Sequence, residues 1–168
     1  MTVLFLQTFV YSQPVNKRYN SHIGKGGLVF FFNPTKVPMD KNNDVHEFVY
    51  DMTYNVASDS LTLNFTIVCK SNLEKPIVGF CSGVTRVKLN AVKMLYVEKN
   101  RRNYIFRFTS KVSFADIVSI FGGSLPLVVK IDIDGRILTA QYSKRGWGKE
   151  VKVMNEIFEL IELQKRML

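Results

Sequence analysis

Residues 103–143 constrain the fold more than any other stretch, because their pattern passes in order from strand to helix and back to strand. Apolar and polar side chains alternate over residues 103–109, as in a strand with one buried face. Residues 113–121 then have the spacing of a short helix behind a possible serine cap. Gly122 and Gly123 follow, and they are expected to end that helix.

The same stretch ends in a predicted hairpin. Residues 125–133 return to a period of two, with Leu127, Val129 and Ile131 on one face. Asp134 and Gly135 form a dipeptide typical of a tight turn, which favours pairing with a strand over residues 136–142. No catalytic motif lies in these elements, so they indicate a binding or assembly module.

Two further strands are predicted in the preceding part of the chain. Residues 45–56 and 61–70 each alternate apolar with polar side chains, and a Ser-Asp-Ser turn separates them, so an antiparallel pair is expected. Thirteen Phe and seven Tyr, beside many Val and Ile, also favour a sheet. We therefore predict an α+β fold, mostly antiparallel, with one short internal helix and a C-terminal helix.

The pattern divides the 168 residues into three parts. Residues 1–44 comprise an apolar strand over 1–11, a polar segment over 12–27, a short apolar run over 28–32 and a loop over 33–44, and they either form an accessory segment or belong to the same core. Residues 45–148 form the predicted β-rich core, in which 84–97 fit either a strand and a helix or two short strands. Residues 149–168 form the predicted C-terminal helix.

An apolar stripe runs along this C-terminal helix and defines a candidate partner-binding surface. Its members recur at helical spacing; they are Val153, Ile157, Leu160 and Ile161. The stripe either packs on the parent sheet or binds a partner groove, and both alternatives remain open at this point. Gly146 and Gly148, on either side of Trp147, are expected to form a hinge before the helix.

Positive charge concentrates in the middle of the chain, which carries a formal net charge of +9. The candidate nucleic-acid-binding residues are Arg86, Lys88, Lys93, Lys99, Arg101, Arg102, Arg107 and Lys111. Tyr96 and Tyr104 flank the Arg101-Arg102 pair, so phosphate contacts with stacking are feasible. Because no base-reading motif accompanies these cations, nucleic-acid binding is expected to be tolerant of sequence. Acidic protein or lipid headgroups are alternative partners, and so is a basic surface without any ligand.

Candidate catalytic and metal-binding residues are few. Cys81 and His46 have no recognisable third group to orient them, and Asp116, Asp132 and Asp134 are better explained by solvation and by the Asp-Gly turn. The glycine-rich residues 22–27 lack the spacing of a phosphate-binding loop and favour a turn. We therefore expect no enzyme activity, no cofactor and no metal.

The rest of the composition bears on location. Cys69 and Cys81 belong to no CxxC pair, which favours reduced thiols and a nuclear or cytoplasmic setting. Residues 1–11 are apolar but lack the basic start and small-residue cleavage site of a signal peptide. No run approaches the roughly 20 apolar residues that cross a bilayer, so no membrane span is expected.

Several of these motifs resemble the closing segment of a sliding-clamp domain. They are SFADIVSIF at 113–121, LPLVVKI at 125–131 and GRIL at 135–138. The order of short helix, strand, glycine turn and final strand is similar to that of the sliding-clamp superfamily, which includes PCNA and the DNA-damage checkpoint clamp subunits. Strands at 45–70 resemble the opening of the same half. The resemblance implies a β-sheet outer layer, helices facing DNA, and assembly into a ring.

The sequence also departs from that family. A eukaryotic clamp subunit needs two such domains, and 168 residues are too few for both, so this chain would be a single-domain, truncated or divergent relative. The helix at 113–121 contains Asp116 and no Lys or Arg, whereas the family's channel-facing helices are basic. DNA contact is therefore not expected through that helix.

Two functions follow as expectations. The first is a non-catalytic clamp-like or adaptor subunit, in a hetero- or homo-oligomeric complex associated with nucleic acid in DNA repair, replication or checkpoint control. The alternative is a β-rich interaction domain of pleckstrin-homology type, whose basic strands bind a protein partner or acidic lipid headgroups. Two helices on one sheet face would favour the clamp, and a single capping C-terminal helix would favour the alternative.

Overall fold

The computed structural model of this chain describes residues 17–24, 27–39, 45–70, 72–73, 76–133 and 135–167. Within those ranges the chain forms ten strands and two helices. All strand pairs are antiparallel, one helix is short and internal, and the other is C-terminal. The predicted fold class is therefore confirmed. The expected strand over residues 1–11 lies outside the described residues.

Six strands form the larger sheet, in the order β1-β2-β3-β4-β8-β7. Their bounds are β1 Tyr19–Gly24, β2 Gly27–Val37, β3 Val45–Asn55, β4 Ser60–Cys69, β8 Asn103–Val112 and β7 Lys93–Asn100. The expected pairing of β3 with β4 is present, with Phe48 opposite Ile67 and Tyr50 opposite Phe65. Alternation fixes this register because a slip of one residue would turn each buried aromatic side chain to the other face.

Four strands form the smaller sheet, in the order β10-β9-β5-β6. Their bounds are β5 Ile77–Ser82, β6 Thr85–Lys88, β9 Val128–Ile133 and β10 Arg136–Gln141. The predicted hairpin joins β9 to β10, with Ile133 opposite Arg136 and Gly135 at a φ of 83° that suits glycine. Residues 84–97 contribute two strands, β6 and the first part of β7, and these belong to different sheets.

Strands β1 and β2 belong to the larger sheet, so the described residues of the N-terminal part favour the alternative in which this part shares the core. Strand β2 pairs with β3 on both sides of a register shift in the middle of the strand. Its residues Phe30, Phe32 and Val37 belong to the common core. The loop expected from residue 33 is wrong for residues 33–37, because the strand continues through Pro34. The register shifts between Phe32 and Thr35, and such a bulge accommodates a residue without an amide hydrogen.

Helix α1, Phe114–Phe121, begins as the sequence predicts. The Asp116 amide donates to Ser113 Oγ at 3.0 Å, so the serine caps the first turn. The helix buries one face through Phe114, Ile117 and Ile120. Gly122 follows as its C-cap.

Helix α2, Lys144–Met167, begins earlier than expected and includes the proposed hinge. The Gly146 amide donates to Ser143 Oγ at 3.1 Å, which caps the helix start. Trp147 is buried and stacks on Phe121, with ring centroids 5.1 Å apart. Burial of this large aromatic ring outweighs the low helix propensity of Gly146 and Gly148, so the expected hinge is wrong.

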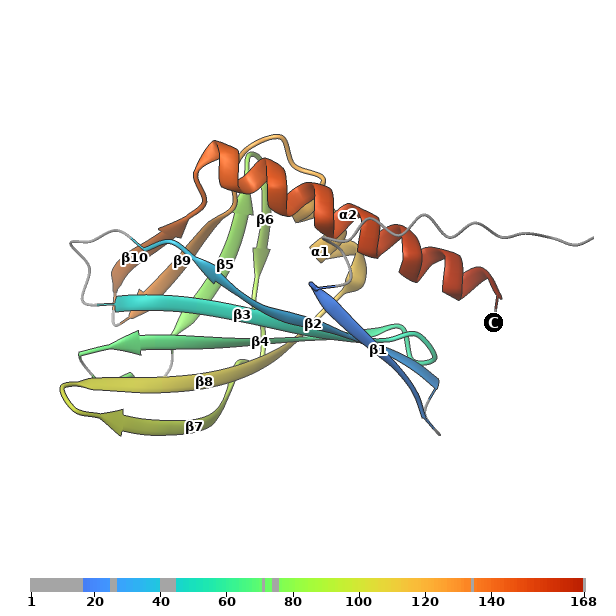
Figure 1. Ribbon diagram of the computed structural model, residues 1–168. Coiled ribbons are helices and arrows are strands. Elements are labelled where there is room, and N and C mark those ends of the chain that lie inside the picture. The colour runs from blue at the N-terminus through green and yellow to red at the C-terminus, as the bar shows by residue number, and fades with distance from the viewer. Residues whose placement is uncertain are drawn as a thin grey trace, which may run out of the picture.

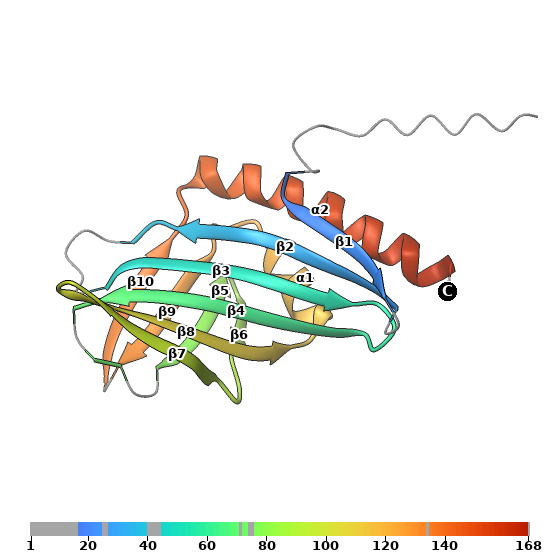
Figure 2. The same cartoon turned by 60° about the horizontal axis from the view of Figure 1, so that its bottom comes forward.

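The two sheets enclose one core, and α2 lies along the β1 and β2 side of it (Figures 1 and 2). Strand β7 lies at the opposite margin of the molecule (Figure 2). Consecutive strands β6 and β7 are the end strands of their respective sheets. The link between them is tied to both sheets, because Leu89 N–H donates to Val78 O at 2.9 Å and the Ser110 hydroxyl donates to Asn90 O at 2.7 Å.

Candidate binding surfaces

Strand β7 is exposed along its whole length and ends the larger sheet. Its central residues Met94, Leu95, Tyr96 and Val97 are 40–56% exposed although all four are large and hydrophobic. An end strand presents amide and carbonyl groups that no described strand of this chain pairs. A contiguous apolar run on such an edge is typical of a protein-binding site.

The register of β7 with β8 places these side chains on two faces. Met94 and Val97 lie opposite Phe108 and Phe106, so they share the core-facing side of the sheet. Tyr96 lies opposite Arg107 on the outer side. The register shifts between Met94 and Tyr96, at Leu95. Both faces of β7 therefore carry exposed apolar groups.

A groove adjoins the core-facing side of β7. It has a volume of about 230 Å³ and is lined from both sheets; its residues are Pro76, Ile77, Lys88, Leu89, Val92, Met94 and Phe108. Ile77 is half exposed at this position. A strand added to β7 would direct alternate side chains toward this groove, which gives the edge a means of selecting apolar residues.

Four of the sequence-predicted cations, Lys93, Lys99, Arg101 and Arg102, lie on this edge strand or in the turn that follows it, and Lys88 lines the groove beside Met94. Arg86 and Lys88 lie on β6, Lys93 and Lys99 on β7, Arg101 and Arg102 in the β7–β8 turn, and Lys111 on β8. All seven residues are exposed. Among the described residues no carboxylate forms an ion pair with any of them.

Arg107 differs from the other predicted cations. Its guanidinium forms an ion pair with Asp51 and donates to Thr66 Oγ1 at 3.0 Å. Asp51 also accepts from Asn64 Nδ2 at 3.0 Å. Arg107 is thus engaged by residues of neighbouring strands, and it is not available to a phosphate in the way the exposed cations are.

The β7–β8 turn contains a hollow of about 510 Å³ at the Arg101-Arg102 pair. Arg101 has a φ of 56°, a left-handed conformation that turns the chain. Lys99 Nζ lies 5.6 Å from the centre of the Tyr104 ring, so this face of Tyr104 is occupied. Of the two tyrosines expected to stack on bases, Tyr96 is the more exposed.

The predicted apolar stripe of α2 packs mainly inside the protein. Ile157 and Ile161 are fully buried, whereas Val153 and Leu160 are half-buried. Next to Ile157, the ring of Phe158 contacts the rings of Phe32, Phe114 and Phe121. Of the two alternatives for the stripe, packing inside the protein therefore holds for Ile157 and Ile161. These two side chains are not available to a partner in the folded chain.

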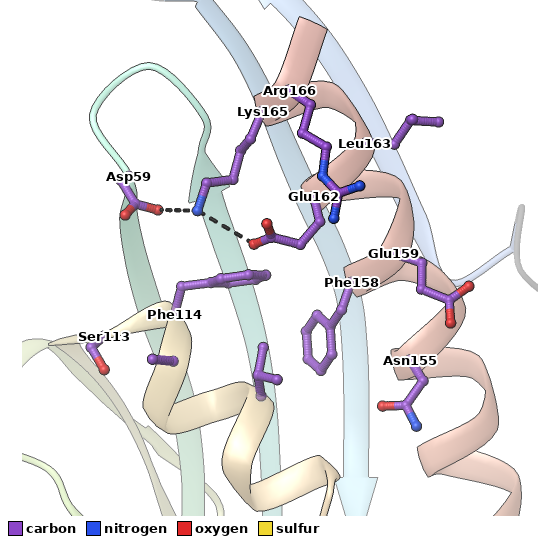
Figure 3. A pocket seen from close by; sticks show the side chains of 12 residues that line it. Asp59, Ser113, Phe114, Asn155, Phe158, Glu159, Glu162, Leu163, Lys165 and Arg166 are labelled. Carbon is purple, nitrogen blue, oxygen red and sulfur yellow. Dashed lines mark hydrogen bonds and ion pairs between the residues drawn. The ribbon is translucent and has the colours of Figure 1, made fainter. Parts of the chain in front are cut away.

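A different part of α2 borders a hollow of about 960 Å³ between α1 and the C-terminal half of α2 (Figure 3). Phe114 and Phe158 form its floor, edge to face at 5.5 Å, and Val118 and Leu163 contribute exposed apolar surface. No sequence pattern indicated this groove. In the sequence, the only indication of an exposed apolar surface here is that Leu163 lies outside the apolar stripe of α2.

One end of this groove is fixed by a network around Asp59 in the β3–β4 turn (Figure 3). The Tyr54 hydroxyl donates to Asp59, and Lys165 Nζ donates to Asp59 at 3.2 Å and to Glu162 at 3.4 Å. The hydrogen bond from Tyr54, followed by that from Lys165, lowers the pKa of Asp59. Burial, followed by the bond to Asp59, raises the pKa of Tyr54 to about 12.

A partly buried ion pair links the segment before β1 to α2, and no sequence pattern indicated it. Arg18 Nη2 lies 2.5 Å from Glu150 Oε1, and the Glu150 side chain is only 6% exposed. Arg18 also donates to Thr35 Oγ1 at 2.9 Å. The hydroxyl of Tyr50 donates to Glu150 at 3.4 Å, and burial is the main cause that raises the pKa of Tyr50.

The residues considered for catalysis have structural places. Cys81 lies on β5 and exposed His46 on β3, in different sheets, with no described hydrogen bond between them. Asp132 accepts from the Gly135 amide at 2.9 Å in the hairpin turn. Gly24 and Gly27 pair at the ends of β1 and β2, whereas residues 25–26 and Asp134 lie outside the described residues. Within the described part of the chain, no group of three His, Cys, Asp or Glu could hold a metal ion.

Comparison with known proteins identifies no family. No family model matches the sequence, and no curated protein or solved structure matches it. Neither described helix is long and apolar enough to cross a membrane. The function is therefore argued from the surfaces themselves.

Proposed function

We propose that this chain is a non-catalytic adaptor subunit whose edge strand β7 accepts an extended segment of a partner protein. The observation that carries the proposal is the exposed apolar run from Met94 to Val97 on the end strand of the larger sheet. A partner strand would pair with the outward amides and carbonyls of β7 and cover these side chains. The main-chain bonds would supply affinity, and the groove beside Met94 would select side chains.

Charge favours a particular partner. Lys93 and Lys99 lie on β7, Arg101 and Arg102 follow it, and Glu98 is the one acid of the strand. Two copies of this chain, each with a formal net charge of +9, would repel one another, which disfavours self-association. A segment in which apolar and acidic residues alternate would meet both requirements, so we assign the partner to that class.

Nucleic-acid binding is the second candidate, and the hollow at Arg101 and Arg102 supports it. Exposed cations at this edge would contact phosphates without reading bases, and Tyr96 offers a ring for stacking. If this site binds nucleic acid, Arg101→Ala with Arg102→Ala should reduce the slope of log affinity against log salt by up to about two. Lys149→Ala with Lys152→Ala on α2 is the matched control, because it removes the same charge from exposed positions elsewhere.

Such an adaptor could act as a clamp-like subunit in DNA repair, replication or checkpoint control, and we include this role in the proposal. An unpaired edge strand would suit subunit assembly, whereas α1 offers no Lys or Arg to DNA. The placement of α2 along one side of the core supports the alternative of a pleckstrin-homology-like interaction domain. Protein binding without catalysis is common to both, and nuclear or cytoplasmic location stays a prediction.

A defined pair of peptides tests the edge-strand proposal. The protein should bind an eight-residue peptide that alternates valine with glutamate, and bind a valine and lysine peptide of equal length much more weakly. Leu95→Glu with Val97→Glu should abolish binding of the acidic peptide, since it adds like charge where apolar contact is needed. Ile23→Glu, on exposed edge strand β1 at the other end of the sheet, is the control and should bind normally.

The proposal fails if the two peptides bind equally, or if the β7 double variant remains folded and binds like the unaltered protein. Circular dichroism and thermal unfolding of each variant establish that the fold is kept. Both β7 positions are about half exposed, so little loss of stability is expected from them.

A further inference from the structure

We infer that the groove between α1 and α2 is a second docking site, and that it takes a basic amphipathic helix of a partner protein. This surface borders the two helices, away from β7, and the inference goes beyond the proposed function (Figures 2 and 3). Three features carry it: the shape of the groove, its exposed apolar surface, and a local charge opposite to that of the whole protein.

Two helices wall the groove, and the β3–β4 turn closes one end. The side chains of Phe114 and Phe158 face each other between the helices (Figure 3). Val118 on α1 and Leu163 on α2 are 36% and 52% exposed, so each wall presents an uncovered apolar group. A groove of about 960 Å³ between helices suits a third helix, which would insert side chains at positions i, i+3 or i+4, and i+7.

The charge of the groove selects a basic occupant. Its acidic residues are Asp59, Glu159 and Glu162, and its cations are Lys165 and Arg166. Lys165 is already engaged, because it donates to Asp59 and Glu162 and lies 5.4 Å from the centre of the Phe114 ring. Glu159 and Arg166 have no ion pair among the described residues, and Glu159 lines the groove one helical turn before Leu163.

This local balance contrasts with the formal charge of +9 for the chain. A basic partner would be repelled by the net positive charge of the protein, and less so at this groove, where three carboxylates line the surface with two cations. Charge complementarity would therefore both attract a basic helix to this groove and orient it there. The fixed Tyr54–Asp59–Lys165 network would act as the end wall against which the docked helix rests.

The test uses a 14-residue helical peptide of leucine and lysine with the leucines on one face, and a counterpart in which glutamate replaces each lysine. Fluorescence anisotropy should show binding of the lysine peptide and not of the glutamate peptide. Leu163→Arg should weaken binding about tenfold or more, because it removes an apolar contact and adds a repelling charge. Glu159→Lys should weaken it as well, and the loss should shrink as salt rises.

Ile137→Arg on β10 is the matched control, since Ile137 is 62% exposed and lies outside the groove. It should bind like the unaltered protein, and Leu163→Arg should keep the binding of β7 to its acidic peptide. Equal affinity of Leu163→Arg and the unaltered protein would overturn the inference, and so would a preference for the glutamate peptide. Self-association that Leu163→Arg abolishes, without lysine-peptide binding, would overturn it in favour of a second copy.

Discussion

Ile157→Ala should destabilise the protein strongly, although Ile157 belongs to the stripe of α2 that the sequence identified as a candidate partner-binding surface. The Ile157 side chain is 0% exposed, and its neighbours belong to the single core. The substitution removes three buried carbon groups at about 0.8 kcal/mol each, or roughly 2.4 kcal/mol. A cavity term adds to this loss, because the surrounding aromatic side chains relax only in part. We therefore expect a total loss of about 3–4 kcal/mol in the free energy of unfolding.

Leu163→Ala is the matched variant on the same helix. Leu163 is about half exposed and loses less buried surface, so its effect should stay under about 1 kcal/mol. For a chain of this length, 1 kcal/mol shifts the melting temperature by roughly 2–4 °C. The melting temperature should thus fall by roughly 6–16 °C for Ile157→Ala and by under about 4 °C for Leu163→Ala.

Thermal and urea unfolding, followed by circular dichroism, measure both variants. Equal stability of the two variants would refute the placement of Ile157 in the core. A loss under about 1 kcal/mol for Ile157→Ala would do the same, since replacing a fully buried isoleucine by alanine typically costs about 2–5 kcal/mol. The result would then return the whole α2 stripe to the partner-binding alternative.

Two further perturbations test other contacts. Glu150→Gln should lower the free energy of unfolding by about 1–3 kcal/mol, a range kept low because Arg18 is partly exposed. A double-mutant cycle with Arg18→Ala should show coupling between the two residues, and additive losses would contradict the ion pair. Stability should also fall as pH rises above 10, because Tyr54 in the unfolded chain loses its proton near the ordinary pKa of 10.0, whereas the folded side chain keeps it to about 12. Urea unfolding of Tyr54→Phe at pH 8 and pH 11 should show a smaller decline than the unaltered protein, and an equal decline would contradict the network.

The sequence predicted elements whose pattern is local. Alternating residues specified β3, β4 and β8, a serine cap and apolar spacing specified α1, and the Asp-Gly dipeptide specified the β9–β10 hairpin. In each of these strands and in α1, one face is buried and the other is solvated, so apolar and polar residues recur with the period of the element. The buried stripe of α2 has the same origin.

Other features depend on contacts between distant residues and leave no local record. The early start of α2 follows from the packing of Trp147 on Phe121, and the Arg18–Glu150 pair joins residues 132 positions apart. The cations of the middle segment were visible in the sequence, but the position of Lys93, Lys99, Arg101 and Arg102 at one sheet edge follows from sheet order. Strand β7 has no alternation, because both of its faces are exposed.

Amide hydrogen exchange on β7, with and without the valine and glutamate peptide, tests the edge-strand proposal most directly. In the free protein the outward amides of β7 should exchange rapidly, because no described strand pairs with them. Bound peptide should protect those outward amides and leave the amides of edge strand β1 unchanged. Protection absent from β7 at saturating peptide, or spread equally over β1, would contradict strand addition at this edge.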